Sequence, residues 1–339
     1  MNEIRSVDGP VDAASANAAE ATPGRVRRRK GPGLGPRLPA STPWWMKIVP
    51  FFVSALFFVS ALFLPFAPMP LLLAYFRSGR RWALTAILTN STLVLLLRGP
   101  LGLAIYLTFV VVPSLALCEL VGRRRSPERI VGTTLLLMAG SAVSLMLGYA
   151  YLQGVNPWTG LQAELTNVLN AVGQSMNGRA GSGQPMMTGP EFEEWKENIL
   201  REFPSNIAVF ALVMTWTNLV ALLRLNPGGI REKLGLKPAY FQNWKAPEIL
   251  VWPTIAAGAL LIFAQGPAWD LAWNAFKFLM AIYAIQGLSI LSFFFDMWNI
   301  RGLFRALGFL TGVILMMPLL LSLGFFDLWF DFRSKFRQS

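Results

Sequence analysis

Two aspartates and an arginine near the end of the chain are the residues whose types and spacing could most directly do chemistry. Asp327, Asp331 and Arg333 lie in GFFDLWFDFR, immediately after a long apolar segment. Carboxylates close to a cation can form a catalytic or ion-handling site. The aromatic residues of the same stretch favour a different interpretation, because aromatic side chains gather where a membrane helix meets water.

This second interpretation gives each residue a structural role. Gly324 is expected just past the last turn of the final apolar helix. The helix dipole disfavours an aspartate at a helix C-terminus, so Asp327 is expected as the N-cap of a new, short interfacial turn. Asp331 and Arg333 are then expected in water. The aromatic belt at the boundary would consist of Phe325, Phe326, Trp329, Phe330 and Phe332.

Polar side chains in the middle of apolar segments are a second candidate site. Asn90, Asn218, Tyr283 and Gln286 come from three different segments. Together they could line a pocket whose donors and acceptors bind a neutral or zwitterionic solute. The alternative is hydrogen bonding between helices, which is the usual role of amide side chains in lipid.

A third candidate is the loop over 225–247, which mixes aromatic and basic residues. Such a loop is expected to be anchored among lipid headgroups, and it is compatible with binding a cytosolic partner or an anionic lipid. The residues expected to make these contacts are Lys237, Tyr240, Phe241, Trp244 and Lys245.

The chain lacks the residue types of the common membrane enzymes. Histidine is absent, which removes the commonest general base and metal ligand. Cys118 is the single cysteine and lies in an apolar run, so it is expected to be a buried small hydrophobe. The Glu193-Glu194 doublet lacks the arginine and histidines of CAAX-type intramembrane proteases. We therefore expect no enzyme, no catalytic residue, no metal and no cofactor.

The composition requires a membrane. Of 339 residues, 54% are hydrophobic and 14% are charged, and this much apolar surface cannot be hidden in one soluble core. An all-α, polytopic transmembrane bundle is expected, with eight to nine apolar segments. The segment over 66–77 is short and follows a proline-rich break. The segments are expected at about 45–64, 66–77, 82–98, 101–121, 130–152, 205–224, 248–265, 271–295 and 306–325.

Charge indicates the topology. The net charge of +12 is spread over short loops between apolar segments, which is typical of a topology signal and not of nucleic-acid binding. By the positive-inside rule, the N-terminus and the basic loops are expected in the cytoplasm. The expected domains are a disordered basic tail (1–43), a transmembrane domain (44–326) and an interfacial C-terminal tail (327–339).

The long loop over 153–204 is expected on the opposite side of the membrane. Its residues 161–172 form a weak helical pattern, and 173–184 are expected to be a flexible linker. The stretch TGPEFEEWKENILREFP, after this linker, predicts a short amphipathic helix lying on the membrane surface. Lys277 lies within about two turns of a segment end and can reach the interface.

Three stretches, FQNWKAPEILVWP (241–253), YAIQGLSILSFFFDMW (283–298) and GFFDLWFDFR (324–333), carry a family resemblance, and PMPLLLAYFRSGRR (68–81) adds to it. In these the chain resembles the YybS-like family of uncharacterised bacterial integral membrane proteins. This resemblance implies a multi-pass protein of a bacterial inner membrane. A fainter likeness in layout is to the substrate-binding subunits of energy-coupling-factor transporters and to the rod-shape scaffold protein MreD. The stretch expected as the first helix, FFVSALFFVSALFL, lacks the AxxxA docking motif of the transporter subunits.

Two functions follow from these observations. The first is a solute-binding or transport-related membrane subunit, with the polar pocket as its site and the 225–247 loop facing a partner protein. The alternative is a non-enzymatic membrane scaffold or assembly factor with an MreD-like role. In both, the lipid bilayer is the expected environment.

Overall fold

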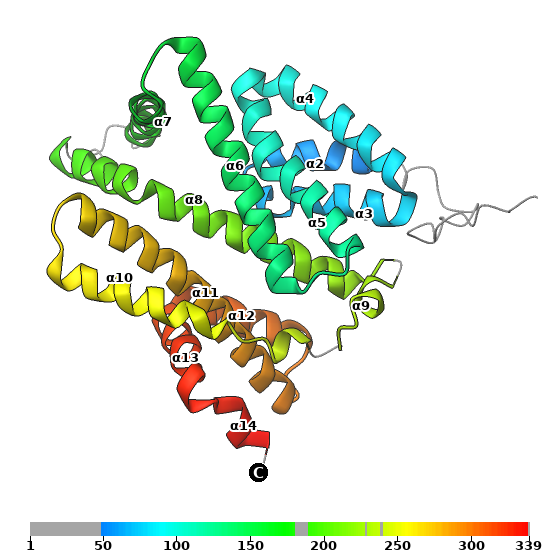
Figure 1. Ribbon diagram of the computed structural model, residues 1–339. Helices are drawn as coiled ribbons and strands as arrows, with labels where there is room; N and C mark the ends of the chain where they lie inside the picture. Colours follow the sequence, from blue (N-terminus) through cyan, green and yellow to red (C-terminus); the bar gives the residue numbers. More distant parts are fainter. Residues whose placement is uncertain (1–48, 180–188, 228, 238–239, 338–339) are drawn as a thin grey trace, which may run out of the picture. The chain divides into compact units, whose positions relative to one another are not determined.

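The computed structural model describes residues 49–179, 189–227, 229–237 and 240–337, all of which belong to the unit Leu34–Ser339 (Figure 1). The expected tail over 1–43 lies outside the described residues. No strand occurs in the described part of the chain, so the expected all-helical class is confirmed.

The first helices form a compact group around a break. Pro65, Pro68 and Pro70 prevent a continuous helix here, and Pro68 occupies the first turn of the helix that follows, where its missing N–H has no cost. Ala55, Leu71 and Val94 are buried where these helices pack together. The elements are α2 (Pro50–Val59), η1 (Leu64–Phe66), α3 (Pro68–Ser78), α4 (Arg80–Tyr106), the π-turn η2 (Leu107–Val111) and α5 (Val112–Gly122).

The remaining helices include the longest in the chain. α11 packs against α8, α10 and α13, and α6 packs against α5 and α8 (Figure 1). In chain order they are α6 (Pro127–Gln153), α7 (Pro157–Arg179), α8 (Gly189–Leu225), α9 (Ile230–Lys233), η3 (Tyr240–Gln242), η4 (Glu248–Leu250), α10 (Val251–Phe263), α11 (Pro267–Met297), α12 (Gly302–Leu315), α13 (Met317–Phe330) and α14 (Phe332–Arg337).

The expected count of eight to nine membrane segments is not confirmed. Among the described residues, four helices are long and apolar enough to cross a membrane, or five if the bent pair α12 and α13 is one span. α2, α3 and α10 have 10, 11 and 13 residues, whereas a crossing helix needs about 20. The segments expected at 82–98 and 101–121 form one stretch, Arg80–Gly122, with a kink at Gly99.

The amphipathic helix expected after residue 188 is not a separate element, because it continues through Pro204 into the membrane segment as α8. The side-chain amide of Asn274, on α11, hydrogen-bonds to the backbone on both sides of Pro204. Asn274 Oδ1 accepts the Ser205 N–H at 2.9 Å, and Asn274 Nδ2 donates to the Arg201 carbonyl at 3.0 Å. These two backbone groups would otherwise bond to each other in a helix, so the side chain is inserted into the ladder.

The expected linker over 173–184 is also partly wrong. Residues 173–179 belong to α7, and the rest of this stretch lies outside the described residues.

α11 and α13 cross at two glycines. A Cβ at Gly324 would lie 1.9 Å from the Tyr283 carbonyl oxygen, and one at Gly287 would lie 2.1 Å from the Leu320 carbonyl oxygen. Both distances are far too short for a contact between two atoms that are not bonded to each other. The two backbones can therefore approach this closely only because neither residue has a side chain. Gly324 therefore lies inside α13, and the expectation that it ends the helix is wrong.

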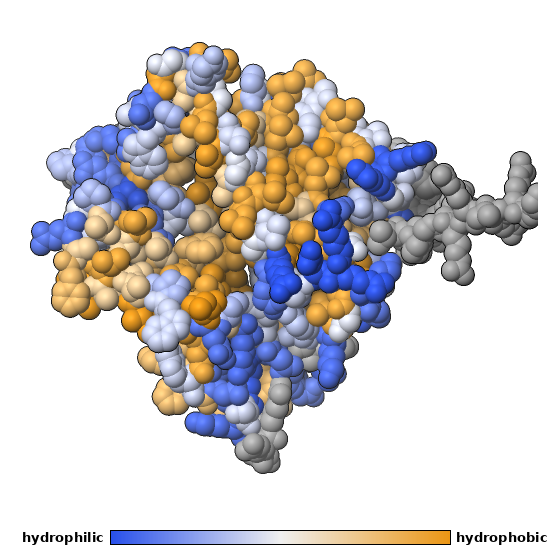
Figure 2. Space-filling model, viewed as in Figure 1, coloured by the Kyte–Doolittle hydropathy of each residue, from blue (hydrophilic) through white to orange (hydrophobic). Residues whose placement is uncertain are grey.

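The surface divides into apolar and polar regions. In Figure 2, hydrophobic residues cover the face over α4, α5 and α6, while hydrophilic residues gather around the α5–α6 turn and α9 and again over α7 and the start of α8. Leu88, Leu96, Leu136 and Leu152 are among the exposed side chains of the apolar region. This surface fits a bilayer, which is as apolar as these side chains.

Candidate functional site

A buried ion pair lies at the end of the chain. Asp327 Oδ2 and Arg333 Nη2 are 2.6 Å apart, and the two side chains are 0% and 3% exposed. Asp327 is in the last turn of α13 and Arg333 is in α14, so the αL residue between the helices, Asp331, folds one charge back onto the other. Charges withdrawn from water in this way are tolerated only when they are paired and hydrogen-bonded.

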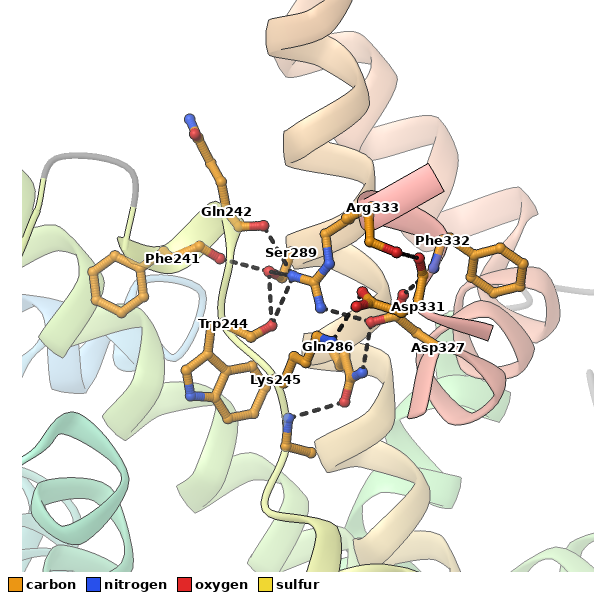
Figure 3. Close-up of polar contacts among 12 residues, drawn as sticks. Phe241, Gln242, Trp244, Lys245, Gln286, Ser289, Asp327, Asp331, Phe332 and Arg333 are labelled. Atoms are coloured by element: carbon orange, nitrogen blue, oxygen red, sulfur yellow. Dashed lines mark hydrogen bonds and ion pairs between the residues drawn. The ribbon is translucent and has the colours of Figure 1, made fainter. Parts of the chain in front are cut away.

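Hydrogen bonds from α11 and from the loop before α10 surround the pair (Figure 3). Arg333 Nη1 donates to the carbonyls of Gln242 and Trp244, both at 3.0 Å. Gln286 Nε2 donates to Asp327 Oδ2 at 3.0 Å, while its Oε1 accepts the Ala246 N–H at 2.9 Å. The guanidinium and the amide therefore bind the backbone of residues 242–246 to the bundle.

Ser289 adds a further tie to the same loop. Its hydroxyl lies 2.6 Å from the Phe241 carbonyl and 3.1 Å from the Trp244 carbonyl, and Arg333 Nη1 lies 3.3 Å from Ser289 Oγ. One hydroxyl on α11 thus bridges the loop and the buried arginine (Figure 3).

This geometry corrects two expectations for the C-terminal stretch. Arg333 is not in water, because it is buried, and Asp327 is not an N-cap residue by position, because it lies inside α13. The Asp327 carboxylate nevertheless accepts the Phe332 N–H at 3.0 Å, at the start of α14. Asp331 is half-exposed and pairs with Lys245 at 2.9 Å, and this contact holds the pKa of Asp331 below its usual value.

The four polar residues of the expected pocket do not gather at one site. Asn90 accepts the Ala55 N–H at 2.8 Å and donates to the Pro50 carbonyl at 3.0 Å, which ties α4 to α2. Asn218 Nδ2 donates to the Pro65 carbonyl at 2.6 Å, in the broken segment before α3.

Tyr283 and Gln286 lie about one turn apart on α11. The Tyr283 ring packs edge-on against Phe325 with 5.2 Å between centroids, and Gln286 belongs to the ion-pair network. The structure thus brings Gln286 together with Asp327, and no hydrogen bond among the described residues joins the three amides.

The aromatic residues of the expected docking loop fold back onto the bundle. Trp244 is buried, its ring lies 4.5 Å from that of Trp216, and its indole N–H donates to Glu128 Oε1 at 3.0 Å. The Tyr240 hydroxyl donates to the same carboxylate. Burial, with help from the Glu128 contact, raises the pKa of Tyr240. Phe241 packs edge-on against Trp216.

The other face of the same loop lines a pocket of about 330 Å³. Its wall includes the loop residue Gln242, the α11 residue Ser292 and basic residues from the end of α8, from α9, from the loop and from α12. Among the residues that the structure describes, no carboxylate lines it. The basic residues are Arg224, Arg231, Lys237 and Arg305.

The basic turns of the chain gather at this end of the bundle. Phe76, Val121, Leu222 and Trp244 belong to one buried cluster, which places the ends of α3, α5 and α8 beside the loop. The basic stretches RSGRR and GRRRSPER begin at the C-terminal ends of α3 and α5. We call this region, with the pocket and the ion-pair network, the basic end.

The family of the chain can now be stated. The family described as "Predicted membrane protein (DUF2232)" matches residues 48–328. The chain belongs to this family. The resemblance to YybS-like membrane proteins is thereby confirmed. No curated protein and no solved structure matches the chain significantly.

The family match includes the loop, α11 and Asp327, and it ends before Arg333. Sequence reasoning had named Gln286, Trp244 and Lys245 but missed Glu128, Ser289 and Arg305. Glu128 and Ser289 carry no motif, and their role depends on contacts with residues more than 40 positions away. Only Arg305 had a local signal, because it lies among basic residues between two apolar segments.

The buried carboxylate and the pocket of the basic end differ in the groups that they offer. Within the described ranges, no group of three or more His, Cys, Asp or Glu could hold a metal ion. The buried carboxylate has its hydrogen bonds filled by Arg333, Gln286 and the Phe332 N–H. The pocket, in contrast, offers cationic donors beside apolar walls.

Proposed function

We propose that this protein is a non-enzymatic binding subunit of a bacterial inner membrane, related to solute binding or transport, and that it binds its ligand at the basic end. The observation that carries this proposal is the buried pair of Asp327 and Arg333, which holds the loop over 240–246 against α11. The same loop lines the pocket.

The energetics favour a role in preorganisation. Removing a carboxylate and a guanidinium from water costs several kcal/mol per ion, and the pair offsets this cost only with good geometry and further hydrogen bonds. An apolar pair could hold two helices together at lower cost. Here the arginine binds two loop carbonyls, so the charges fix a backbone shape. A binding surface that is already ordered loses less entropy when it meets its ligand.

In this proposal, the amides in the membrane segments serve as structural ties. Asn218 donates to the Pro65 carbonyl in the broken segment before α3, and Asn90 donates to the Pro50 carbonyl and accepts the Ala55 N–H of α2. Asn90 and the Asn218 Nδ2 make their hydrogen bonds within the protein, whereas Asn218 Oδ1 is buried without a partner among the described residues. We assign the ligand to the pocket at the basic end because cationic donors line that pocket, whereas the described partners of these amides are backbone groups. The positive-inside rule supports a cytoplasmic location for this end.

Native mass spectrometry of the detergent-purified protein tests the proposal. The wild-type protein is expected to retain a bound small molecule. Ser289→Ala removes the hydroxyl that holds the loop but leaves the ion pair, so it should lower the occupancy of this molecule. Ser322→Ala is the matched control, because its exposed hydroxyl bonds only to the Pro318 carbonyl of its own helix. A wild-type spectrum with neither a bound molecule nor a partner protein would contradict the proposal.

A scaffold function is the second candidate, and it is favoured by α6. Only 22% of the apolar window of this helix is buried, compared with 44–56% in the other three candidate spans. Its small residues Gly140 and Gly148 have no atom of the described chain within 4 Å of a Cβ position. Small residues on the surface of a membrane helix allow a second helix to pack closely against it.

Cysteine crosslinking distinguishes the two functions. The variant Gly140→Cys should crosslink to another membrane protein in intact cells if α6 is a scaffold surface, and to none if lipid covers it. Leu88→Cys on the exposed face of α4 controls for random collision.

A further inference from the structure

The pocket at the basic end has the features of a phosphate-binding site. Four cationic side chains from four parts of the chain surround it, which are Arg224 on α8, Arg231 on α9, Lys237 in the loop and Arg305 on α12. Guanidinium groups bind phosphate oxygens through paired N–H donors, and an ammonium adds a point charge.

The charges in and around the pocket do not balance. Arg305 pairs with Asp296, and Arg231 lies 3.4 Å from Glu232. Arg224 and Lys237 make no ion pair with any residue that the structure describes. Two positive charges therefore line the pocket without a counter-ion among the described residues, and their repulsion would be relieved by an anion.

Part of the pocket is already ordered for such a ligand. Arg305 Nη2 donates to Ser292 Oγ at 2.7 Å, while Nη1 donates to Asp296, so the guanidinium plane is fixed. Gln242 also donates to Asp296, and its carbonyl is held by Arg333. The buried ion pair thus contacts the pocket wall through the backbone carbonyl of Gln242.

The position of the pocket points to the lipid boundary. Arg224 is in the last turn of α8, Arg305 is in the first turn of α12, and Ser292 is near the end of α11. Apolar spans end at this level, where phospholipid headgroups lie. The wall also contains Leu223, Leu236 and Phe241, which suit the glycerol and acyl carbons next to a phosphate.

We propose that this pocket binds the phosphate group of an anionic phospholipid headgroup. The inference rests on the proposed binding function and names the class of its ligand. A phosphate from a soluble compound would use the same donors, so the experiment has to separate the two sources.

The test measures thermal stabilisation of the purified protein by phosphatidylglycerol, by phosphatidylcholine and by glycerol 3-phosphate. A ligand that binds only the folded state raises the melting temperature with its concentration. Phosphatidylglycerol is expected to stabilise the protein most, and added salt should weaken the effect. Phosphatidylcholine should have little effect, because its headgroup has no net charge.

The double variant Arg224→Gln/Lys237→Gln should weaken the apparent affinity for phosphatidylglycerol about tenfold or more, as expected when hydrogen bonds to charged groups are lost. Because neither side chain has an ion-pair partner, this variant should fold normally. Arg129→Gln is the matched control, since it removes an exposed charge at the basic end outside the pocket.

Each outcome has a distinct meaning. If phosphatidylglycerol stabilises the wild-type protein and Arg129→Gln but not the double variant, the proposal holds. If glycerol 3-phosphate gives the same residue dependence at lower concentration, the site takes a soluble phosphate and the lipid assignment is overturned. The phosphate site is overturned if phosphatidylglycerol stabilises the double variant as much as it stabilises Arg129→Gln. It is also overturned if phosphatidylglycerol stabilises none of the three proteins, the wild type included. A bound molecule without phosphate in the native mass spectrum would still support the binding function.

Discussion

Each end of the bundle has an ion pair, and the two pairs differ in how much water reaches the charges. Asp327 and Arg333, at the basic end, have side chains that are 0% and 3% exposed. Lys277 and Glu202, at the opposite end, are 26% and 30% exposed, although their separation of 2.7 Å is almost the same. Distance alone therefore does not describe what either pair does.

The surroundings explain the difference. The Glu202 carboxylate also accepts the Trp273 indole N–H at 2.8 Å, and Lys277 reaches Asn206 Oδ1 at 3.0 Å, so this pair connects side chains of two helices. The Arg333 guanidinium instead donates to loop carbonyls. The half-exposed pair joins elements that already pack together, whereas the buried pair determines the conformation of a loop.

The largest effect is expected from breaking the buried pair. Arg333→Gln leaves the Asp327 carboxylate buried without its cation, so the free energy of unfolding should fall by about 3–5 kcal/mol. Equilibrium unfolding in detergent, followed by tryptophan fluorescence, measures the change.

A double variant identifies the source of this loss. Asp327→Asn in the Arg333→Gln background removes the unpaired charge, so the double variant should be more stable than the single one. Equal stability of the two would mean that the lost packing of the arginine, and not the unpaired charge, causes the destabilisation.

The second-largest loss of stability is expected where α11 and α13 cross at Gly287 and Gly324. Gly324→Ala places a methyl group against the Tyr283 carbonyl, so α11 and α13 must separate, at a cost of about 1–3 kcal/mol or more. Gly140→Ala is the control, because nothing lies within 4 Å of its Cβ position. Alanine there should be neutral or stabilising by up to about 1 kcal/mol, since it is the better helix former. Equal losses at both positions would contradict the crossing.

These two features show where prediction from the sequence succeeds and where it stops. The apolar runs predicted helices, and α3, α6 and α11 lie where hydrophobicity placed them, whereas the segment expected at 205–224 is only the second part of α8. The role of Gly324 depends on α11, and a glycine near the end of an apolar run has the local signature of a helix cap. Likewise, the loop carbonyls bound by Arg333 are 89 and 91 residues away. An arginine in a polar tail therefore resembles an exposed one until the fold is known.

A smaller effect is expected at the opposite end. Lys277→Gln should lower the free energy of unfolding by no more than about 1 kcal/mol, because water can solvate the Glu202 carboxylate once the lysine is gone. The same denaturation measurement applies. A loss as large as that of Arg333→Gln would show that exposure does not separate the two pairs.

The smallest effect is expected at Asp331, which pairs with Lys245 at the edge of the buried network with both side chains 44% exposed. Asn tolerates the αL backbone found here, so Asp331→Asn changes the charge without straining the turn. The lysine lowers the pKa of Asp331, so its contribution is complete above the unfolded value of about 3.9 and is lost as the pH falls through the folded pKa.

The wild-type protein should therefore exceed Asp331→Asn in stability by less than about 1 kcal/mol at pH 7, and the difference should disappear in strong acid. Unfolding curves of both proteins from pH 7 down to about pH 2, at low and high salt, measure it. A difference that grows as the pH falls would have the wrong sign for a carboxylate stabilised by a cation. Such a result would show that the effect comes from the turn and not from the charge of Asp331. Asp327 would then be the carboxylate whose charge holds this end of the chain in place.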